Sequence, residues 1–184
     1  MNYYQEHKEM RWQVNIKIKI NLNPWVKDKS SLSKKIINIM PFRIKELKAR
    51  HIKIFNDEKV FFQKKNTGDL YVREALIFAD KLPIIYARTV IPKKHLRGFW
   101  GRVKSLKDSP LSEIVFKKKS ILRSNFVFKN LSDNHELRKR LNVYKIFERG
   151  RIMARKSVFN HKGQKALLTE VFLSNIEEIK FLEK

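Results

Sequence analysis

Apolar residues recur along this chain with the period expected of β-strands, and short polar turns separate the apolar stretches. The strongest pattern covers residues 70–78 and 82–91, which are rich in β-branched and aromatic residues. Only Ala79-Asp80-Lys81 separates the two stretches, and Pro92 follows the second. This arrangement predicts a β-hairpin that ends at the proline.

A second hairpin is predicted near the carboxyl end. Residues 146–159 and 165–173 are both strand-like, and the turn between them contains Gly163 at a position that suits a positive φ. Hairpins that follow one another in sequence form an antiparallel sheet.

The remaining pattern is weaker and adds strands and short helices around these hairpins. Strands or extended segments are expected at residues 12–20, 42–47, 51–55 and 121–128, with a turn at 56–58. Capping residues, prolines and apolar spacing predict helices at residues 31–39, 111–116 and 135–144. Residues 93–118 lose strand character and are expected to form a lid. The predicted class is α+β: a single antiparallel β-sheet with helices packed beside it, in one domain spanning residues 1–184.

Composition excludes some chemistry. The chain has no cysteine, so it has no disulfide, no thiolate metal site and no cysteine nucleophile. Its five histidines are scattered without an i, i+4 pair, and we expect neither a metal ion nor a cofactor. No apolar run reaches the roughly 18 residues of a membrane-spanning helix, and the amino-terminal residues are polar. We therefore expect a cytoplasmic protein that does not span a membrane.

The charge balance changes the picture less than its size suggests. Lys and Arg number 42 against 18 Asp and Glu, which gives a formal net charge of +24. Clustered cations favour nucleic acids or other polyanions. The excess is mostly lysine, however, and it is spread along the whole chain among many Ile and Asn residues, which share AT-rich codons. We favour compositional drift over selection for a polyanion partner.

Three charged residues stand in the middle of apolar strands: Arg73, Arg88 and Glu170. A charge there either points outward or lies in a buried site, where desolvation costs several kcal/mol unless the charge is paired. Two cations and one carboxylate on one face of a sheet would form a pocket for a small anion, with an acid/base group beside it. A plain ion pair between Arg73 and Glu170 is the alternative, and Arg88 could also be an edge residue whose charge reaches solvent.

Four segments resemble the chorismate lyase (chorismate pyruvate-lyase) family when taken together in this order and at these separations: YVREALIFAD, ARTVIP, DSPLSEIVF and LLTEVFL. The resemblance is dense from about residue 70 to 116 and from about 149 to 173. It implies an antiparallel sheet with an internal ligand cavity under two helical flaps. It also implies a metal-free reaction that converts chorismate into 4-hydroxybenzoate and pyruvate at the head of ubiquinone biosynthesis.

The resemblance also implies roles for individual residues. Arg73 matches the family arginine that binds the ring carboxylate, and Glu170 matches the glutamate near the 4-hydroxyl group. Arg88 matches an arginine near the pocket, where it would meet the second carboxylate of chorismate. Leu32 and Leu111 match positions that offer backbone N–H groups to the ligand. The transferred hydrogen could pass directly to the enolpyruvyl methylene or through Glu170 as general base.

Two other functions remain open. The segment 93–104 combines five Lys or Arg residues with Phe99 and Trp100, so a basic nucleic-acid-binding module is the alternative from another class. We consider a flap with an apolar underside the better interpretation of this segment, and nucleic acid the less favoured partner. A related lyase or hydrolase that acts on another enolpyruvyl substrate is the third possibility. The predicted partners are therefore small molecules, chorismate and 4-hydroxybenzoate, bound by a monomer.

Overall fold

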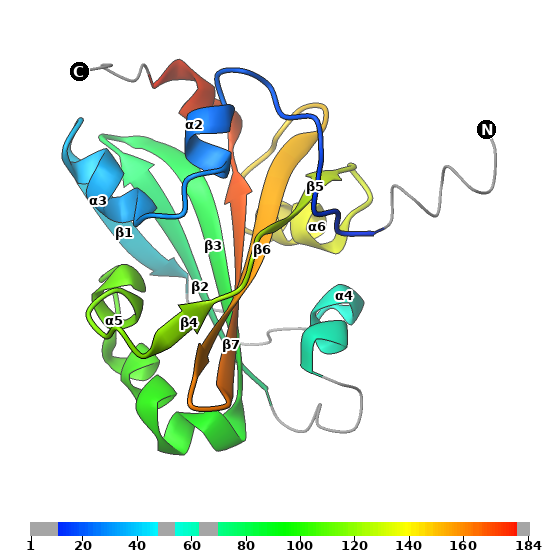
Figure 1. Ribbon diagram of the computed structural model, residues 1–184. Helices are drawn as coiled ribbons and strands as arrows, with labels where there is room; N and C mark the ends of the chain where they lie inside the picture. The colour runs from blue at the N-terminus through cyan, green and yellow to red at the C-terminus, as the bar shows by residue number, and fades with distance from the viewer. Residues whose placement is uncertain (1–10, 48–53, 63–69, 180–184) are drawn as a thin grey trace.

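One antiparallel sheet organises the computed structural model, which describes residues 11–47, 54–62 and 70–179 (Figure 1). The path of the sheet runs β1-β2-β3-β7-β6-β4, and β5 also pairs with β6. The strands are β1 (Phe42–Leu47), β2 (Leu70–Ala79), β3 (Leu82–Pro92), β4 (Ile121–Arg123), β5 (Val127–Leu131), β6 (Ile152–His161) and β7 (Gln164–Phe172). Every strand pairing is antiparallel.

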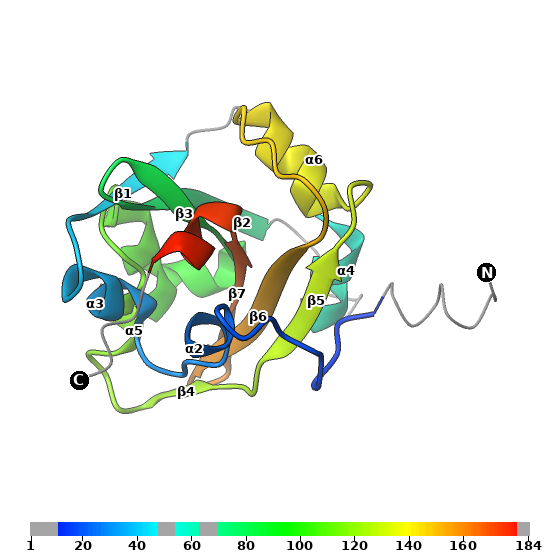
Figure 2. The ribbon, with the colours of Figure 1, turned by 90° about the horizontal axis from the view of Figure 1, so that it is seen from above.

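Short helices cover both faces of the sheet (Figures 1 and 2). The α-helices are α2 (Asn23–Val26), α3 (Leu32–Ile37), α4 (Asn56–Lys59), α5 (Ser112–Val115) and α6 (Glu136–Val143), and the 3-10 helices are η1 (Val60–Phe62), η3 (Lys93–Arg97), η4 (Phe99–Ser105) and η5 (Ser174–Glu178). Residues of α2, α3, η4 and α5 pack on one face, which we call the cavity face. Residues of α6 and the segment before α4 pack on the other, which we call the covered face.

The hairpin formed by β6 and β7 has a tight two-residue turn. Lys162 and Gly163 both have positive φ, and the flanking residues His161 and Gln164 pair directly. Two consecutive positive φ values give a turn whose twist matches that of the strands, and glycine adopts this conformation without strain. The register then continues without a break along β6 and β7.

The first hairpin contains a register shift. Near its turn Phe78 lies opposite Pro83, whereas Ile77 lies opposite Ile85. Ile84 is therefore the extra residue of a β-bulge in β3. A bulge moves every later residue of its strand by one position relative to the partner strand.

This bulge decides which charged residues share a face. A regular hairpin through the same two-residue turn would place Arg73 opposite Arg88. In the structure Arg73 lies opposite Thr89, and Arg88 lies opposite Glu74. Because side chains alternate between the two faces, the one-residue shift puts Arg73 and Arg88 on opposite sides of the sheet.

The α+β class, both hairpins, the first strand at 42–47 and the three predicted helices are confirmed. Ser31 caps α3 as expected, with its Oγ accepting a hydrogen bond from the Lys34 N–H at 3.3 Å. Among the described residues, no helix is long and apolar enough to cross a membrane.

Other predicted elements differ in the structure. Residues 121–128 contain β4 and the start of β5 rather than one strand. Residues 12–20, expected as a strand or an extended segment, form no strand and make one bridge, from Gln13 to Phe128. Residues 56–58 are helical, and the stretch 146–151 precedes β6 rather than belonging to it. The strand predicted at 51–55 lies partly outside the described residues, and its last two residues are not in a strand.

Candidate active site

A small cavity lies on the cavity face, between the sheet and the segments that contain α3 and α5. Its volume is about 50 Å³. Apolar side chains form much of its wall, among them Ile44, Ala75, Ile77, Ala87, Leu168 and Phe159. The charged residues that line it are Arg73 from β2, Arg123 from β4 and Glu170 from β7. Water exclusion by the apolar wall strengthens every charge interaction inside the cavity.

Arg73 is buried, and main-chain carbonyls accept its hydrogen bonds. Its Nη2 donates to the carbonyl of Lys107 at 2.7 Å and to that of Ser109 at 2.9 Å, both in the segment that leads into α5. Its Nε is buried with no hydrogen-bond partner among the described residues. Burial lowers the pKa of the Arg73 guanidinium, against the opposing charges of Glu46 and Asp108. A guanidinium with a donor to spare inside a cavity is suited to a ligand carboxylate.

Glu170 shares the cavity with Arg73, but its own ion pairs are with other arginines. Arg155 Nε donates to Glu170 Oε2 at 2.6 Å, and Arg123 Nη2 lies 3.3 Å from the same oxygen. Burial raises the pKa of Glu170, but the charge and hydrogen bond of Arg155 and the charge of Arg123 outweigh burial and leave it below the ordinary value. The carboxylate is therefore ionised near neutral pH and is a weak base.

Arg123 was not among the predicted site residues. Its Nε donates to Ser157 Oγ at 2.9 Å, and its guanidinium lies against the rings of Phe126 and Phe159. Burial lowers the pKa of Arg123 to about 10 and the charge of Arg155 adds to this effect, while the Glu170 charge opposes it. The side chain remains a cation at neutral pH.

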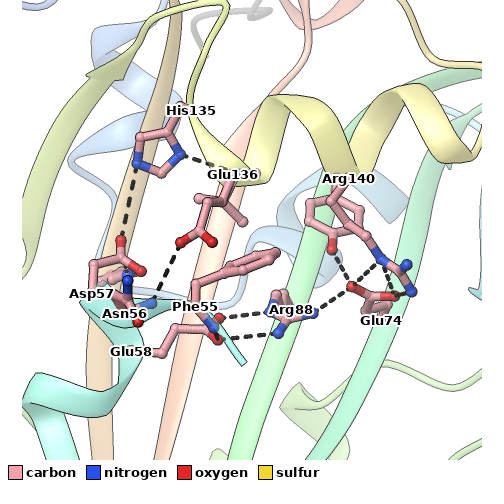
Figure 3. Close-up of polar contacts among 12 residues, drawn as sticks. Phe55, Asn56, Asp57, Glu58, Glu74, Arg88, His135, Glu136 and Arg140 are labelled. Carbon is pink, nitrogen blue, oxygen red and sulfur yellow. Dashed lines mark hydrogen bonds and ion pairs between the residues drawn. The ribbon is translucent and has the colours of Figure 1, made fainter. Parts of the chain in front are cut away.

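The prediction that Arg88 belongs to the site was wrong. Its side chain is fully buried on the covered face, where Nε donates to Glu58 Oε1 at 2.6 Å and Nη1 donates to Glu74 Oε1 at 2.5 Å (Figure 3). Glu74 is also bound by Arg140 from α6 at 2.6 Å. The bulge at Ile84 is the physical cause, because it turns Arg88 away from the cavity. Arg88 therefore ties β2, β3 and α4 together and does not line the cavity.

The structure brings the remaining predicted residues together. Leu32 and Leu111 are buried and line the cavity, the first at the start of α3 and the second immediately before α5. They face the strands that carry Arg73 and Glu170. Their expected contribution of N–H groups to a ligand stays a prediction.

The two aromatic rings of the basic segment 93–104 are engaged within the protein, Trp100 fully and the half-buried Phe99 in part. Trp100 is fully buried, and its Nε1 donates to the carbonyl of Gln164 at 2.9 Å. Phe99 lies 4.4 Å from the His161 ring, between ring centroids, and Lys118 and Arg102 lie over it. Single-stranded nucleic acids are commonly bound on exposed aromatic rings, so this arrangement favours the interpretation as an apolar flap underside.

These features describe a class: an α+β protein with a small cavity whose charged and apolar lining suits a small organic anion. The described residues contain no group of three or more His, Asp or Glu side chains that could hold a metal ion. The chemistry available inside the cavity is carboxylate binding by arginine, hydrogen bonding by Glu170 and exclusion of water.

Comparisons with known proteins identify the family. A family model described as "Chorismate lyase" matches residues 7–179. The chain is 30% identical over 159 residues to a "Probable chorismate pyruvate-lyase" of Cupriavidus pinatubonensis, covering 85% of this chain and 82% of that protein. It is 29% identical over 157 residues to a protein of the same description from Nitrosospira multiformis, covering 84% of this chain and 87% of that protein.

A solved structure agrees with the fold alone. The gene product SA0254 of Staphylococcus aureus superposes with a TM-score of 0.52 at 13% identity, covering 86% of this chain and 98% of that chain. With the family match over most of its length, this chain belongs to the chorismate lyase family and is an enzyme of the lyase class.

Proposed function

We propose that this protein converts chorismate into 4-hydroxybenzoate and pyruvate. The observation that carries the proposal is that Arg73 and Glu170 line the same cavity from β2 and β7. Only β3 lies between these strands, so their axes are roughly 9–10 Å apart. A benzene ring with one substituent on Arg73 and the other on Glu170 fits between two side chains that extend from strands at this separation.

Arg73 binds the ring carboxylate in this proposal. Its contacts to the carbonyls of Lys107 and Ser109 fix one end of the guanidinium, and its Nε has no partner among the described residues. A bound carboxylate would satisfy this donor with a charge-assisted hydrogen bond. The same contacts connect the arginine to the segment before α5, so the ligand and this flap would become ordered together.

The reaction requires orientation more than strong acid or base catalysis. The bond between ring carbon three and the ether oxygen breaks, and the hydrogen on ring carbon four moves to the enolpyruvyl methylene group. The ring becomes aromatic and pyruvate leaves in its keto form, which makes the reaction strongly downhill. Holding the substrate in the reactive geometry can supply roughly 7–11 kcal/mol of the barrier at best.

Glu170 is assigned to the 4-hydroxyl group as a positioning hydrogen-bond acceptor. Arg155 keeps the pKa of Glu170 low, which makes it an inefficient general base near neutral pH. We therefore favour direct cyclic transfer of the hydrogen over a path through this carboxylate.

Substrate entry requires movement of the flaps. A cavity of about 50 Å³ holds a few water molecules and is smaller than a substituted six-membered ring. The segments at Leu32 and Leu111 are the parts of the wall that do not belong to the sheet, so they would move apart and then close over the ligand. We further propose that the enzyme acts in the cytoplasm as a monomer, at the first committed step of ubiquinone biosynthesis.

Product identification tests the proposal. The purified full chain is incubated with chorismate, 4-hydroxybenzoate is quantified by chromatography, and pyruvate is quantified with lactate dehydrogenase. Equal amounts of both products, formed well above the rate without enzyme, are expected. Wild-type protein that forms neither product from chorismate would contradict the proposal.

A further inference from the structure

Arg123 is a cation of the cavity wall that the family resemblance did not supply. It lies in β4, outside the two segments that carry the resemblance, and it pairs with Phe159 of β6 in the register of the sheet. Phe159, Ser157 and Arg155 are alternate residues of β6 and point to the cavity face, and so does Arg123, which lies opposite Phe159. Arg123 therefore reaches the cavity from β4, whereas Arg73 reaches it from β2, nearer the other edge of the sheet.

The two arginines beside Glu170 have different surroundings. Arg155 is 1% exposed, its Nη1 is bound by the carbonyls of Val26 and Asp28 at 2.8 and 2.7 Å, and its Nε holds Glu170. Arg155 does not line the cavity. It lies behind Glu170 and orients this carboxylate, and its buried Nη2 has no hydrogen-bond partner among the described residues.

Arg123 is held less tightly at its tip. Its side chain is 14% exposed, and its two terminal nitrogens make their contacts at 3.3 Å, one to Glu170 and one to the carbonyl of Lys29. Its Nε has the short contact, to Ser157. The Nε end of the guanidinium is thus anchored, while its two terminal nitrogens make long contacts that a ligand can replace.

We propose that Arg123 binds the second carboxylate of the substrate, the one on the enolpyruvyl group, and thereby selects a dicarboxylate. This inference rests on the proposed function. With the ring carboxylate at Arg73 and the 4-hydroxyl group at Glu170, the ether arm at ring carbon three leaves the ring next to Glu170. Arg123 is the cavity-lining cation in contact with Glu170, so it is the group that the second carboxylate meets.

The other arginines considered for this role are occupied. Arg88 lies on the covered face between Glu58 and Glu74. Arg73 is separated from Glu170 by β3 and serves the other end of the ring. A planar guanidinium can hold a carboxylate through two parallel hydrogen bonds, which a lysine cannot.

A pair of ligands tests the inference by binding alone. The first is 4-hydroxybenzoate, with one carboxylate, and the second is 3-(carboxymethoxy)-4-hydroxybenzoate, which adds a carboxylate on an ether arm at position three. Affinities are measured by isothermal titration calorimetry for the wild type and for Arg123→Gln. The variant should bind the dicarboxylate roughly 10- to 100-fold more weakly. Its affinity for 4-hydroxybenzoate should stay within about threefold of the wild type.

Two further variants make the result interpretable. Arg149→Gln removes the same charge from an exposed loop and should leave both affinities unchanged, which controls for the loss of general attraction. Arg123→Lys keeps the charge but loses the planar fork, and a smaller loss confined to the dicarboxylate is expected. The lysine variant also supplies the answer if Arg123→Gln does not fold.

The outcomes separate the two proposals. Equal weakening of both ligands in the Arg123 variants would show a structural role and overturn the inference, and so would unchanged binding of both. If the wild type forms no 4-hydroxybenzoate from chorismate, the proposed function fails whatever the binding data show. If turnover is normal but the Arg123 variants do not discriminate between the ligands, only the inference fails.

Discussion

Replacing Arg88 by methionine should lower the free energy of unfolding by about 3–5 kcal/mol and leave ligand affinity unchanged. The magnitude follows from what the change leaves behind. Glu74 keeps three partners, Arg140, Tyr86 and Tyr144. Within the described part of the chain, the one hydrogen bond left to Glu58 is from the backbone N–H of Phe55, at 2.9 Å. One buried carboxylate therefore loses its ion-pair partner and keeps only the longer-range attraction of Lys156 among the described cations, which approaches the costly case of a broken buried ion pair.

Urea unfolding followed by circular dichroism measures the effect. The double variant Arg88→Met with Glu58→Gln should recover much of the loss, because neither partner is then left charged and alone. A double-mutant cycle isolates this coupling between the two residues. Affinity for 4-hydroxybenzoate is measured on the same samples under conditions where each variant is folded.

Two results would refute the reasoning. The first is an Arg88→Met variant of near wild-type stability that binds ligand weakly, because that would return Arg88 to the site. The second is a double variant no more stable than Arg88→Met, because the loss would then come from packing rather than from the uncompensated charge of Glu58.

Three further predictions concern the carboxylates and Arg73. Arg73→Ala should raise KM and the dissociation constant of 4-hydroxybenzoate by similar factors of roughly 10–100, measured by steady-state kinetics and titration; near-normal values would remove Arg73 from the site. Glu170→Gln should lower kcat by less than about tenfold if the carboxylate only positions the substrate, whereas a loss of roughly 10²–10⁴ would identify it as the base. The pKa values of Glu170, Glu74 and Asp57 are all lowered in the folded state, with neighbouring cations outweighing burial. Their contribution to stability is therefore present above the unfolded pKa values near 4 and is lost as the pH falls through the folded ones; a urea midpoint that rises on acidification from pH 5 to 3 would contradict this sign.

Local signals were sufficient for most of the fold. The two hairpins were predictable because each pairs strands that are neighbours in sequence and carry apolar residues with period two. The helix at α3 was predictable from Ser31, since a capping oxygen and an apolar pair are both local features. The break between β4 and β5 was not predictable. Both strands pair with β6, and the sequence does not show where the pairing with β6 is interrupted.

The site was predicted in part, and the misses have physical causes. A bulge is one extra residue with no strong signature in an apolar run, and Ile84 looks like any strand residue, so the orientation of Arg88 could not be deduced. Arg155 could have been found, because counting back from Gly163 through a two-residue turn places it directly opposite Glu170. Arg123 gave no comparable signal, since β4 is only three residues long.

Burial alone does not distinguish the functional charges of this sheet from the structural ones. Arg88, on the covered face, is as deeply buried as any residue of the cavity, but it is enclosed by two carboxylates that neutralise it. Arg73, on the cavity face, is hydrogen-bonded to main-chain carbonyls, which carry no net charge, and its Nε has no partner in the described part of the chain. Its hydrogen-bond partners are thus dipoles, and the charges of Glu46 and Asp108 offset its charge only in part. A buried cation of this kind lowers its energy by binding an anion, whereas one between two carboxylates does not. Arg123 differs from Arg155 in lining the cavity and in the long contacts of its terminal nitrogens, which a ligand carboxylate could replace.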